Sequence, residues 1–122
     1  MSDNFKIGII GKGFVGGAVS NGFNKNVEQI IVDPVYSDTT LEQLIEQGPT
    51  LTFICVPTPP NEDGSINVDI VTDVLIELSM RDYKGVVVVK STIIPDYLQQ
   101  FKKEFDLKIV YNPEFLTEAN AH

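Results

Sequence analysis

Short apolar runs recur along this 122-residue chain, and the segments between them carry apolar residues at helical spacing. Five runs have the length and composition of strands: residues 5–10, 29–32, 51–56, 86–89 and 108–111. Because these runs are continuous rather than alternating, they indicate strands that are buried on both faces, as in parallel sheets covered by helices.

Each connection between two runs predicts one amphipathic helix, because its apolar side chains recur every three or four residues. The positions are Val15, Val19 and Phe23; Leu41, Leu44 and Ile45; Ile70, Val71, Val74, Leu75 and Leu78; and Leu98, Phe101 and Phe105. Local signals agree, with Asp69 and Pro95 at helix starts and Gly48 at a helix end. We therefore expect an α/β fold: one domain over residues 1–122, with a doubly wound parallel sheet in strand order 3-2-1-4-5 and helices on both faces.

The charge of the chain narrows its range of partners. A formal net charge of −8 argues against nucleic acid, because phosphate-backbone binding depends on Lys and Arg. A dinucleotide stays compatible with this charge, since backbone N–H groups at a helix start can hold a pyrophosphate.

Cysteine, histidine and apolar content predict a cytoplasmic protein without a membrane span or a metal site. Cys55 is the single cysteine, and His122 is the single histidine and the last residue, where we expect it to be solvated. The first residues lack the pattern of a signal peptide, and no apolar run approaches the roughly 20 residues that a spanning helix needs.

A glycine-rich motif, GKGFVG at residues 11–16, follows the first expected strand and opens the first expected helix. Gly11 allows a tight turn, Gly13 lets the backbone approach a pyrophosphate, and Gly16 permits close packing of helix on strand. This placement predicts a Rossmann-type dinucleotide site with contacts from Gly11, Lys12, Gly13, Phe14, Val15 and Gly16. The alternative is a plain strand-to-helix turn, since the pattern also occurs by chance.

Asp33 ends the second expected strand, 22 residues after Gly11. A carboxylate at this place accepts hydrogen bonds from the ribose hydroxyls of NAD, whereas the extra phosphate of NADP would meet like charge. Residues 30–38 contain no Arg or Lys. The sequence therefore predicts NAD over NADP, with a turn-forming aspartate before Pro34 as the structural alternative.

Three further motifs follow the later strands: CVPTP at 55–59, KSTIIP at 90–95 and NPEFLTEANA at 112–121. All three stand at carboxyl ends of expected strands, where an open α/β sheet places its ligand crevice. A long, polar, turn-rich loop spans residues 57–68, and such loops are often functional. With the glycine motif, this ordered set resembles the N-terminal NAD-binding domain of the nucleotide-sugar (UDP-glucose/GDP-mannose) 6-dehydrogenases.

The resemblance implies an oxidoreductase that converts a UDP-sugar C6 alcohol to a carboxylate in two NAD-dependent oxidations. It adds as cofactor contacts Val56, Pro57, Thr58, Ser91, Thr92 and Glu118. It assigns Glu114 a catalytic proton-transfer role toward a water that Thr92 helps to hold. Cys55 is not the thiol nucleophile of the family, and its expected role is that of a small buried hydrophobe.

Each assignment has a structural alternative. Lys90 could simply end a buried strand, and Ser91 with Thr92 could cap the helix that begins at Pro95. Glu114 could stand beside the positive end of a helix. A different NAD-dependent family, of the hydroxyacid or 6-phosphogluconate kind, is disfavoured by the motif after the fifth strand.

In the resembled family the chain continues into a central helix, a nucleophilic-cysteine segment and a sugar-nucleotide domain. We therefore expect this truncated chain to be inactive alone, to need the missing half for a UDP-sugar, and to self-associate through the face left exposed. The alternative is a free-standing NAD-binding module without catalysis. Two departures from the family are Asp38, where a basic residue is common, and Ala119, where glycine is common.

Overall fold

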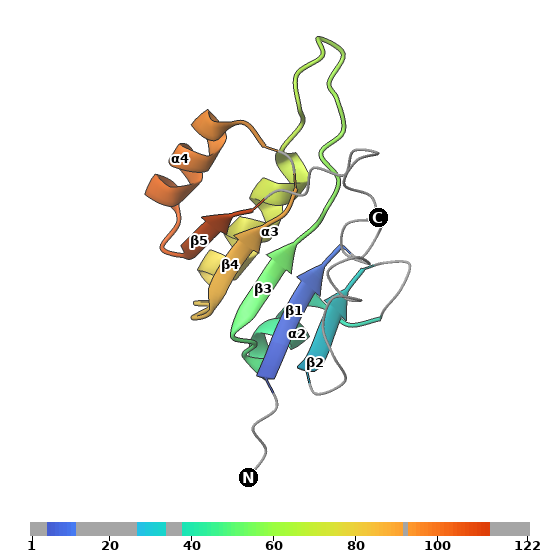
Figure 1. Ribbon diagram of the computed structural model, residues 1–122, viewed down its shortest axis with the longest axis vertical. Coiled ribbons are helices and arrows are strands. Elements are labelled where there is room, and N and C mark those ends of the chain that lie inside the picture. The colour runs from blue at the N-terminus through green and yellow to red at the C-terminus, as the bar shows by residue number, and fades with distance from the viewer. Residues whose placement is uncertain (1–4, 12–26, 34–37, 92, 113–122) are drawn as a thin grey trace.

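A five-stranded parallel sheet forms the centre of the structure (Figure 1). The computed structural model describes residues 5–11, 27–33, 38–91 and 93–112. Its elements are β1 (Phe5–Ile10), β2 (Val27–Val32), α2 (Leu41–Gln47), β3 (Leu51–Ile54), α3 (Asp69–Met80), β4 (Val86–Val89), α4 (Pro95–Glu104) and β5 (Lys108–Tyr111). The expected α/β fold with a parallel sheet is confirmed, while the helix expected around residues 15–23 lies outside the described residues.

The strand order is β2-β1-β3-β4-β5, so the expected order 3-2-1-4-5 is wrong. The third strand pairs with β1, in register Ile7 to Leu51, instead of lying outside β2. The composition of the strands explains this placement. β3 reads LTFI and suits an inner position, whereas β2 carries Glu28 and Gln29 and suits an edge. The chain therefore reverses direction across the sheet at β1, which puts the switch point between β1 and β3.

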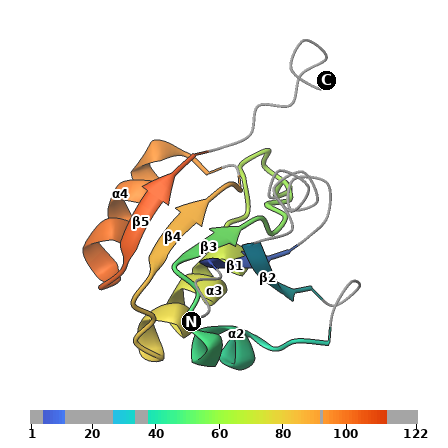
Figure 2. The same cartoon turned by 60° about the horizontal axis from the view of Figure 1, so that its bottom comes forward.

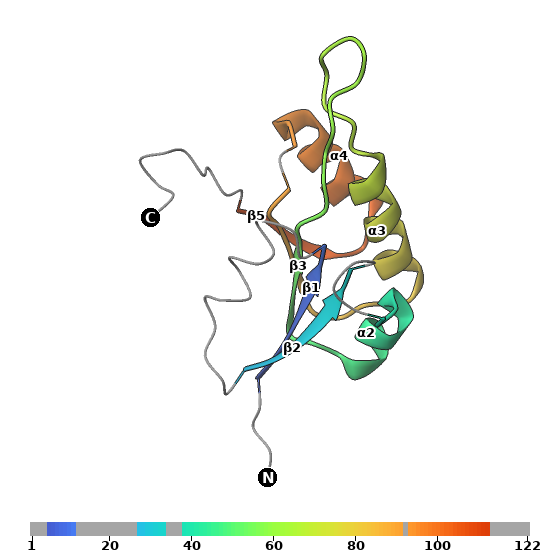
Figure 3. The same ribbon diagram turned by 90° about the vertical axis from the view of Figure 1, so that its right-hand side faces the viewer.

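The three described helices lie on one face of the sheet (Figure 3). From β2 onward every strand-to-strand step runs in the same direction across the sheet, and right-handed crossovers then place α2, α3 and α4 on the same side. Figure 2 shows α2 below the β1–β2 end and α4 beside β5. The expectation of helices on the second face as well falls on residues outside the described part. No described helix has both the length and the apolar character that a membrane span requires.

Both faces of the inner strands are buried, as the continuous apolar runs predict. The helix-covered face brings together buried residues of the sheet and of all three helices: Ile10, Ile54, Val87, Val89, Leu44, Val71, Leu75, Leu78 and Phe101. On the opposite face Ile7 and Ile9 are fully buried and pack with Leu51 and Phe53. Ile70 departs from its expected core position and is 40% exposed, because Val71 provides the buried contact at the start of α3.

The helix boundaries follow the signals in the sequence. α3 begins at Asp69, α4 has Pro95 in its first turn, and Gly48 ends α2 in the left-handed conformation with φ 63°. A capping box that we did not predict opens α2: Thr40 Oγ1 accepts from the Gln43 N–H at 3.1 Å, and Gln43 Oε1 accepts from the Thr40 N–H at 2.8 Å.

A buried hydroxyl pair fixes the amino end of the sheet. Thr52 Oγ1 donates to the Tyr83 hydroxyl at 2.8 Å, and that hydroxyl donates to the carbonyl of Pro49 at 2.9 Å. Burial raises the pKa of Tyr83 above its ordinary value. Gly85 lies directly against the Tyr83 ring, where no Cβ has room. The α3–β4 connection is thereby held to the start of β3.

Candidate cofactor-binding site

The residues that follow the strands meet at the carboxyl edge of the sheet, the edge toward which all the arrowheads point in Figure 1. Backbone hydrogen bonds extend the strand pairing into this edge. Gly11 N–H donates to Val32 O and Cys55 N–H to Ile10 O, both at 2.8 Å. Lys90 N–H donates to Ile54 O at 2.8 Å and Asn112 N–H to Val89 O at 3.0 Å. Backbone hydrogen bonds of the sheet therefore fix the first residue after each of these strands.

Gly11 stands at the switch point in a conformation that favours glycine, with φ 83°. A Cβ at this position would lie 3.0 Å from Cys55 O and 3.0 Å from both the N and Cα atoms of Val56. The start of the glycine motif is thus pressed against the backbone that leaves β3. This close approach fits a chain that must turn sharply into a pyrophosphate-binding loop. The remaining predicted contacts of the motif, Lys12, Gly13, Phe14, Val15 and Gly16, lie outside the described residues.

Asp33 is brought to the same edge as Gly11. It follows directly after Val32, whose carbonyl accepts the Gly11 N–H, and it is half-buried. The juxtaposition of the glycine turn and the acidic residue, predicted from a spacing of 22 positions, is therefore present in the fold. Asp38, which stands where the resembled family commonly has a basic residue, is exposed.

The segment after β3 forms the neighbouring wall. Val56 is buried, Thr58 is half-buried and Pro57 is exposed. Cys55 packs with the cluster around Ile7 and Ile9, but it is half-buried and not buried as expected. β3 ends at Ile54, two residues earlier than expected, so Val56 belongs to the loop at the edge.

Ser91 connects the end of β4 to this wall. Its side chain is 6% exposed, and its Oγ lies 2.7 Å from Val56 O and 3.3 Å from Ile54 O. A hydroxyl has one proton, and the 2.7 Å contact has the normal length of an O–H···O bond, so Val56 O is its acceptor. The alternative that Ser91 caps the following helix is wrong, because the N-cap of α4 is Ile94 and no side chain caps it.

The predicted catalytic residues Glu114 and Thr92, and the predicted contact Glu118, lie outside the described residues. Tyr111, which lies between Thr92 and Glu114 in the sequence, makes a contact that we did not predict. The Tyr111 hydroxyl accepts from Ile93 N–H at 3.1 Å and donates to Ile93 O at 2.9 Å. This reciprocal pair ties the β4–α4 connection to the end of β5. An aromatic residue closing a short strand gives no signal of such a bond in the sequence.

The long polar loop over residues 57–68 forms an arm that projects beyond the carboxyl edge (Figure 1). Its two limbs are joined by an antiparallel bridge between Pro60 and Ile66. At its tip the Asp63 carboxylate accepts from the backbone N–H of Ser65 at 2.9 Å and from its hydroxyl at 2.6 Å. These hydrogen bonds hold the pKa of Asp63 below its ordinary value. The arm is therefore ordered by its own bonds.

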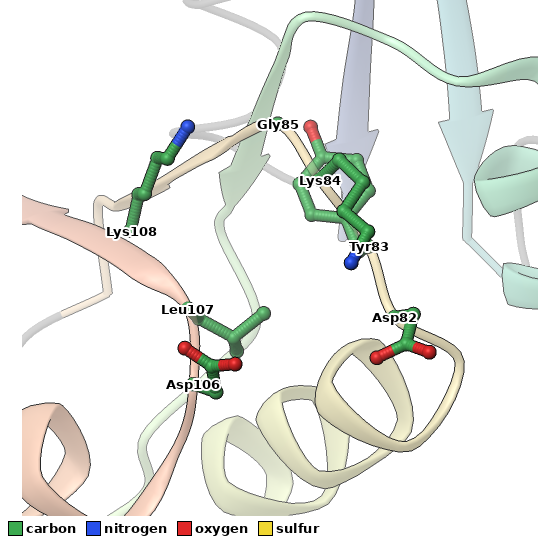
Figure 4. Close-up of a pocket in the computed structure, with 7 residues that line it drawn as sticks. All are labelled: Asp82, Tyr83, Lys84, Gly85, Asp106, Leu107 and Lys108. Atoms are coloured by element: carbon green, nitrogen blue, oxygen red, sulfur yellow. The ribbon is translucent and has the colours of Figure 1, made fainter.

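A hollow of about 310 Å³ lies at the opposite edge of the sheet, where the chain enters β4 and β5 (Figure 4). It is lined by Asp82, Tyr83, Lys84, Gly85, Asp106, Leu107 and Lys108. Ligands of open α/β sheets bind at the carboxyl ends of strands, so this hollow is not the predicted cofactor site. Within the described ranges, no group of three His, Cys, Asp or Glu side chains could hold a metal ion.

The close approach at position 11 generates a prediction with a matched control. Gly48→Ala costs about 1–2 kcal/mol through its positive φ alone, because nothing lies within 4 Å of a Cβ there. Gly11→Ala carries the same kind of cost and adds overpacking against the Cys55–Val56 backbone, about 1–3 kcal/mol more. Urea unfolding of both variants measures the difference, and equal losses would contradict the close contact.

The family model described as the NAD-binding domain of the UDP-glucose/GDP-mannose dehydrogenase family matches residues 35–122. The UDP-glucose 6-dehydrogenase AglM of Haloferax volcanii is 30% identical over 115 residues, which cover 82% of this chain and 26% of AglM. The UDP-glucose 6-dehydrogenase of Rickettsia felis is 36% identical over 77 residues, which cover 57% of this chain and 17% of that protein.

A solved UDP-glucose dehydrogenase from Pyrobaculum islandicum has the same fold. The superposition has a TM-score of 0.62 at 20% identity, and it covers 95% of this chain and 37% of that one. The present chain thus spans about a quarter or less of the curated relatives described above. Motifs, strand-end geometry and family match agree, and the chain belongs to the UDP-glucose/GDP-mannose dehydrogenase family, whose NAD-binding domain it carries.

Proposed function

We propose that this chain is the NAD-binding portion of a UDP-glucose 6-dehydrogenase-like oxidoreductase and is inactive by itself. The observation that carries the proposal is the carboxyl edge, where Gly11 presses on the Val56 backbone and Asp33 stands beside it. This arrangement occurs in a chain whose residues 35–122 match the NAD-binding domain of the family. A cytoplasmic location belongs to the same proposal and rests on the composition of the chain.

The residues at this edge have distinct tasks toward the cofactor. The turn at Gly11 leads into backbone N–H groups that hold the pyrophosphate, which needs no net positive charge. The Asp33 carboxylate accepts hydrogen bonds from the adenosine ribose. Val56, Pro57 and Thr58 form the wall on the adenosine side. When bound, NAD supplies the acceptor for the hydride that leaves the substrate.

Catalytic roles are proposed for two residues of the later motifs. Glu114 moves a proton to or from the water of the second oxidation, and Thr92 orients that water. Glu118 contacts the cofactor. The substrate is a UDP-sugar, the class that the names of the relatives indicate, and its binding needs parts of the enzyme beyond the NAD-binding domain.

Cofactor preference tests the proposed site directly. We expect NAD to bind at least about tenfold more tightly than NADP in isothermal titration calorimetry, because the 2′-phosphate of NADP meets the Asp33 carboxylate. Asp33→Asn raises the Kd for NAD and narrows this ratio. Asp73→Asn removes the same charge from the exposed face of α3 and leaves both affinities unchanged. Tighter binding of NADP to the unaltered chain would refute the assignment of Asp33.

The role of Glu114 is testable in a longer enzyme that contains this domain together with the sugar-binding part. Glu114→Gln keeps the shape of the side chain and removes its ability to exchange a proton. We expect the first oxidation to proceed and the second to slow by about 10²–10⁴-fold, measured as NADH formed per sugar in single-turnover experiments. Full production of both NADH equivalents at the normal rate would remove this role.

Self-association is also part of the proposal. β5 pairs with β4 alone among the described strands, and its Val110 is 49% exposed, so an apolar side chain lies at the surface of this edge strand. Such edges pair with other chains. Sedimentation velocity should show a mass that increases with concentration, and Val110→Lys should reduce the effect. A strictly monomeric chain at every concentration would contradict this expectation.

A further inference from the structure

Ser91, which follows β4, has a buried hydroxyl that hydrogen-bonds to the segment after β3 at the carboxyl edge of the sheet. Its side chain is 6% exposed, and its Oγ donates to Val56 O at 2.7 Å. Lys90 N–H and Ser91 N–H both donate to Ile54 O, at 2.8 and 3.2 Å, so the backbone of β4 already follows β3 to this point. The Ser91 hydroxyl adds a hydrogen bond to Val56 O, two residues beyond Ile54, where β3 ends.

Val56 in turn supports the start of the glycine motif. Its N and Cα atoms each lie 3.0 Å from the point where a Cβ of residue 11 would stand. Outward movement of Val56 would open this contact and remove one of the supports of the turn at Gly11, which is also held by the hydrogen bond from its N–H to Val32 O. A continuous series of contacts therefore runs from β4 through Ser91 to Val56, and from Val56 to the end of β1.

We infer that Ser91 is a positioning residue for the cofactor site, which acts through the Val56 carbonyl. The family resemblance implies that Ser91 lies near the nicotinamide. Because its hydroxyl proton is donated to Val56 O, Ser91 does not donate a hydrogen bond to the nicotinamide. The hydroxyl fixes the wall formed by Val56, Pro57 and Thr58 and keeps the glycine turn pressed against that wall. This inference rests on the proposed NAD site, and it assigns the serine a role that the family match leaves open.

The test compares two buried hydroxyls at opposite ends of the same sheet. Ser91→Ala removes the bond at the carboxyl edge. Thr52→Val removes the bond to Tyr83 near the amino end of β3, where Thr52 is fully buried. Both variants lose one buried hydrogen bond, so thermal unfolding should show similar decreases in Tm. Only Ser91→Ala removes a support of the cofactor wall.

We expect Ser91→Ala to raise the Kd for NAD about tenfold in calorimetry at a temperature where both variants are fully folded, which corresponds to about 1.4 kcal/mol. Thr52→Val should leave the Kd unchanged. Equal increases in the two variants, in proportion to their loss of Tm, would show that Ser91 acts only through general stability and would overturn the inference. An unchanged Kd in Ser91→Ala, beside normal binding by the unaltered chain, would overturn it and leave the NAD site intact.

A measurement without cofactor separates the positioning role from the proposed function. In the free protein, Ser91→Ala should shift the carbonyl-carbon resonance of Val56 and speed the amide hydrogen exchange of the loop that follows it, while Thr52→Val should not. Unaltered resonances at Val56 would overturn the inference whether or not NAD binds. Suppose instead that the resonances shift but the unaltered chain does not bind NAD. The hydrogen bond between Ser91 and Val56 would then be confirmed, and its role in cofactor binding would be overturned.

Discussion

The contact between Gly11 and the backbone of Cys55 and Val56 is the constraint on which the cofactor edge depends. Two parallel strands end side by side at this point, and the chain leaving β1 must turn within the space that one missing Cβ provides. A parallel sheet brings all its carboxyl ends to one edge, so the turn at Gly11 lies next to the residues that follow β2 and β3. Asp33 reaches it through the hydrogen bond between Gly11 and Val32.

Hydroxyl groups make specific hydrogen bonds at both ends of the sheet. At the amino end, Thr52 donates to the Tyr83 hydroxyl, which in turn donates to Pro49 O. At the carboxyl end, Ser91 and Tyr111 fix loop backbone next to the cofactor edge. In an interior of low polarity, a hydroxyl with a partner specifies one arrangement of neighbouring strands, because an unpaired alternative is costly.

An acidic chain can carry a site for a diphosphate because the charge is met locally. Backbone dipoles at the start of a helix can supply the positive potential, so a diphosphate site needs no excess of Lys and Arg. The family match concerns the NAD-binding domain alone, and this chain spans 26% of the length of the relative AglM.

The sequence by itself determined the existence and type of the described elements, because burial on both faces leaves continuous apolar runs and helix ends carry Pro95, Asp69 and Gly48. The glycine motif, the position of Asp33 after the second strand and the family were also recognisable from the sequence alone. Only the tertiary structure decided the strand order, since pairing of β3 with β1 depends on which strand best fills an inner position and not on chain order. It alone showed the bond from Ser91 to Val56 O, which joins residues 35 positions apart. Local patterns record periodicity and turn chemistry, whereas contacts between distant backbone and side-chain atoms exist only after the strands have packed.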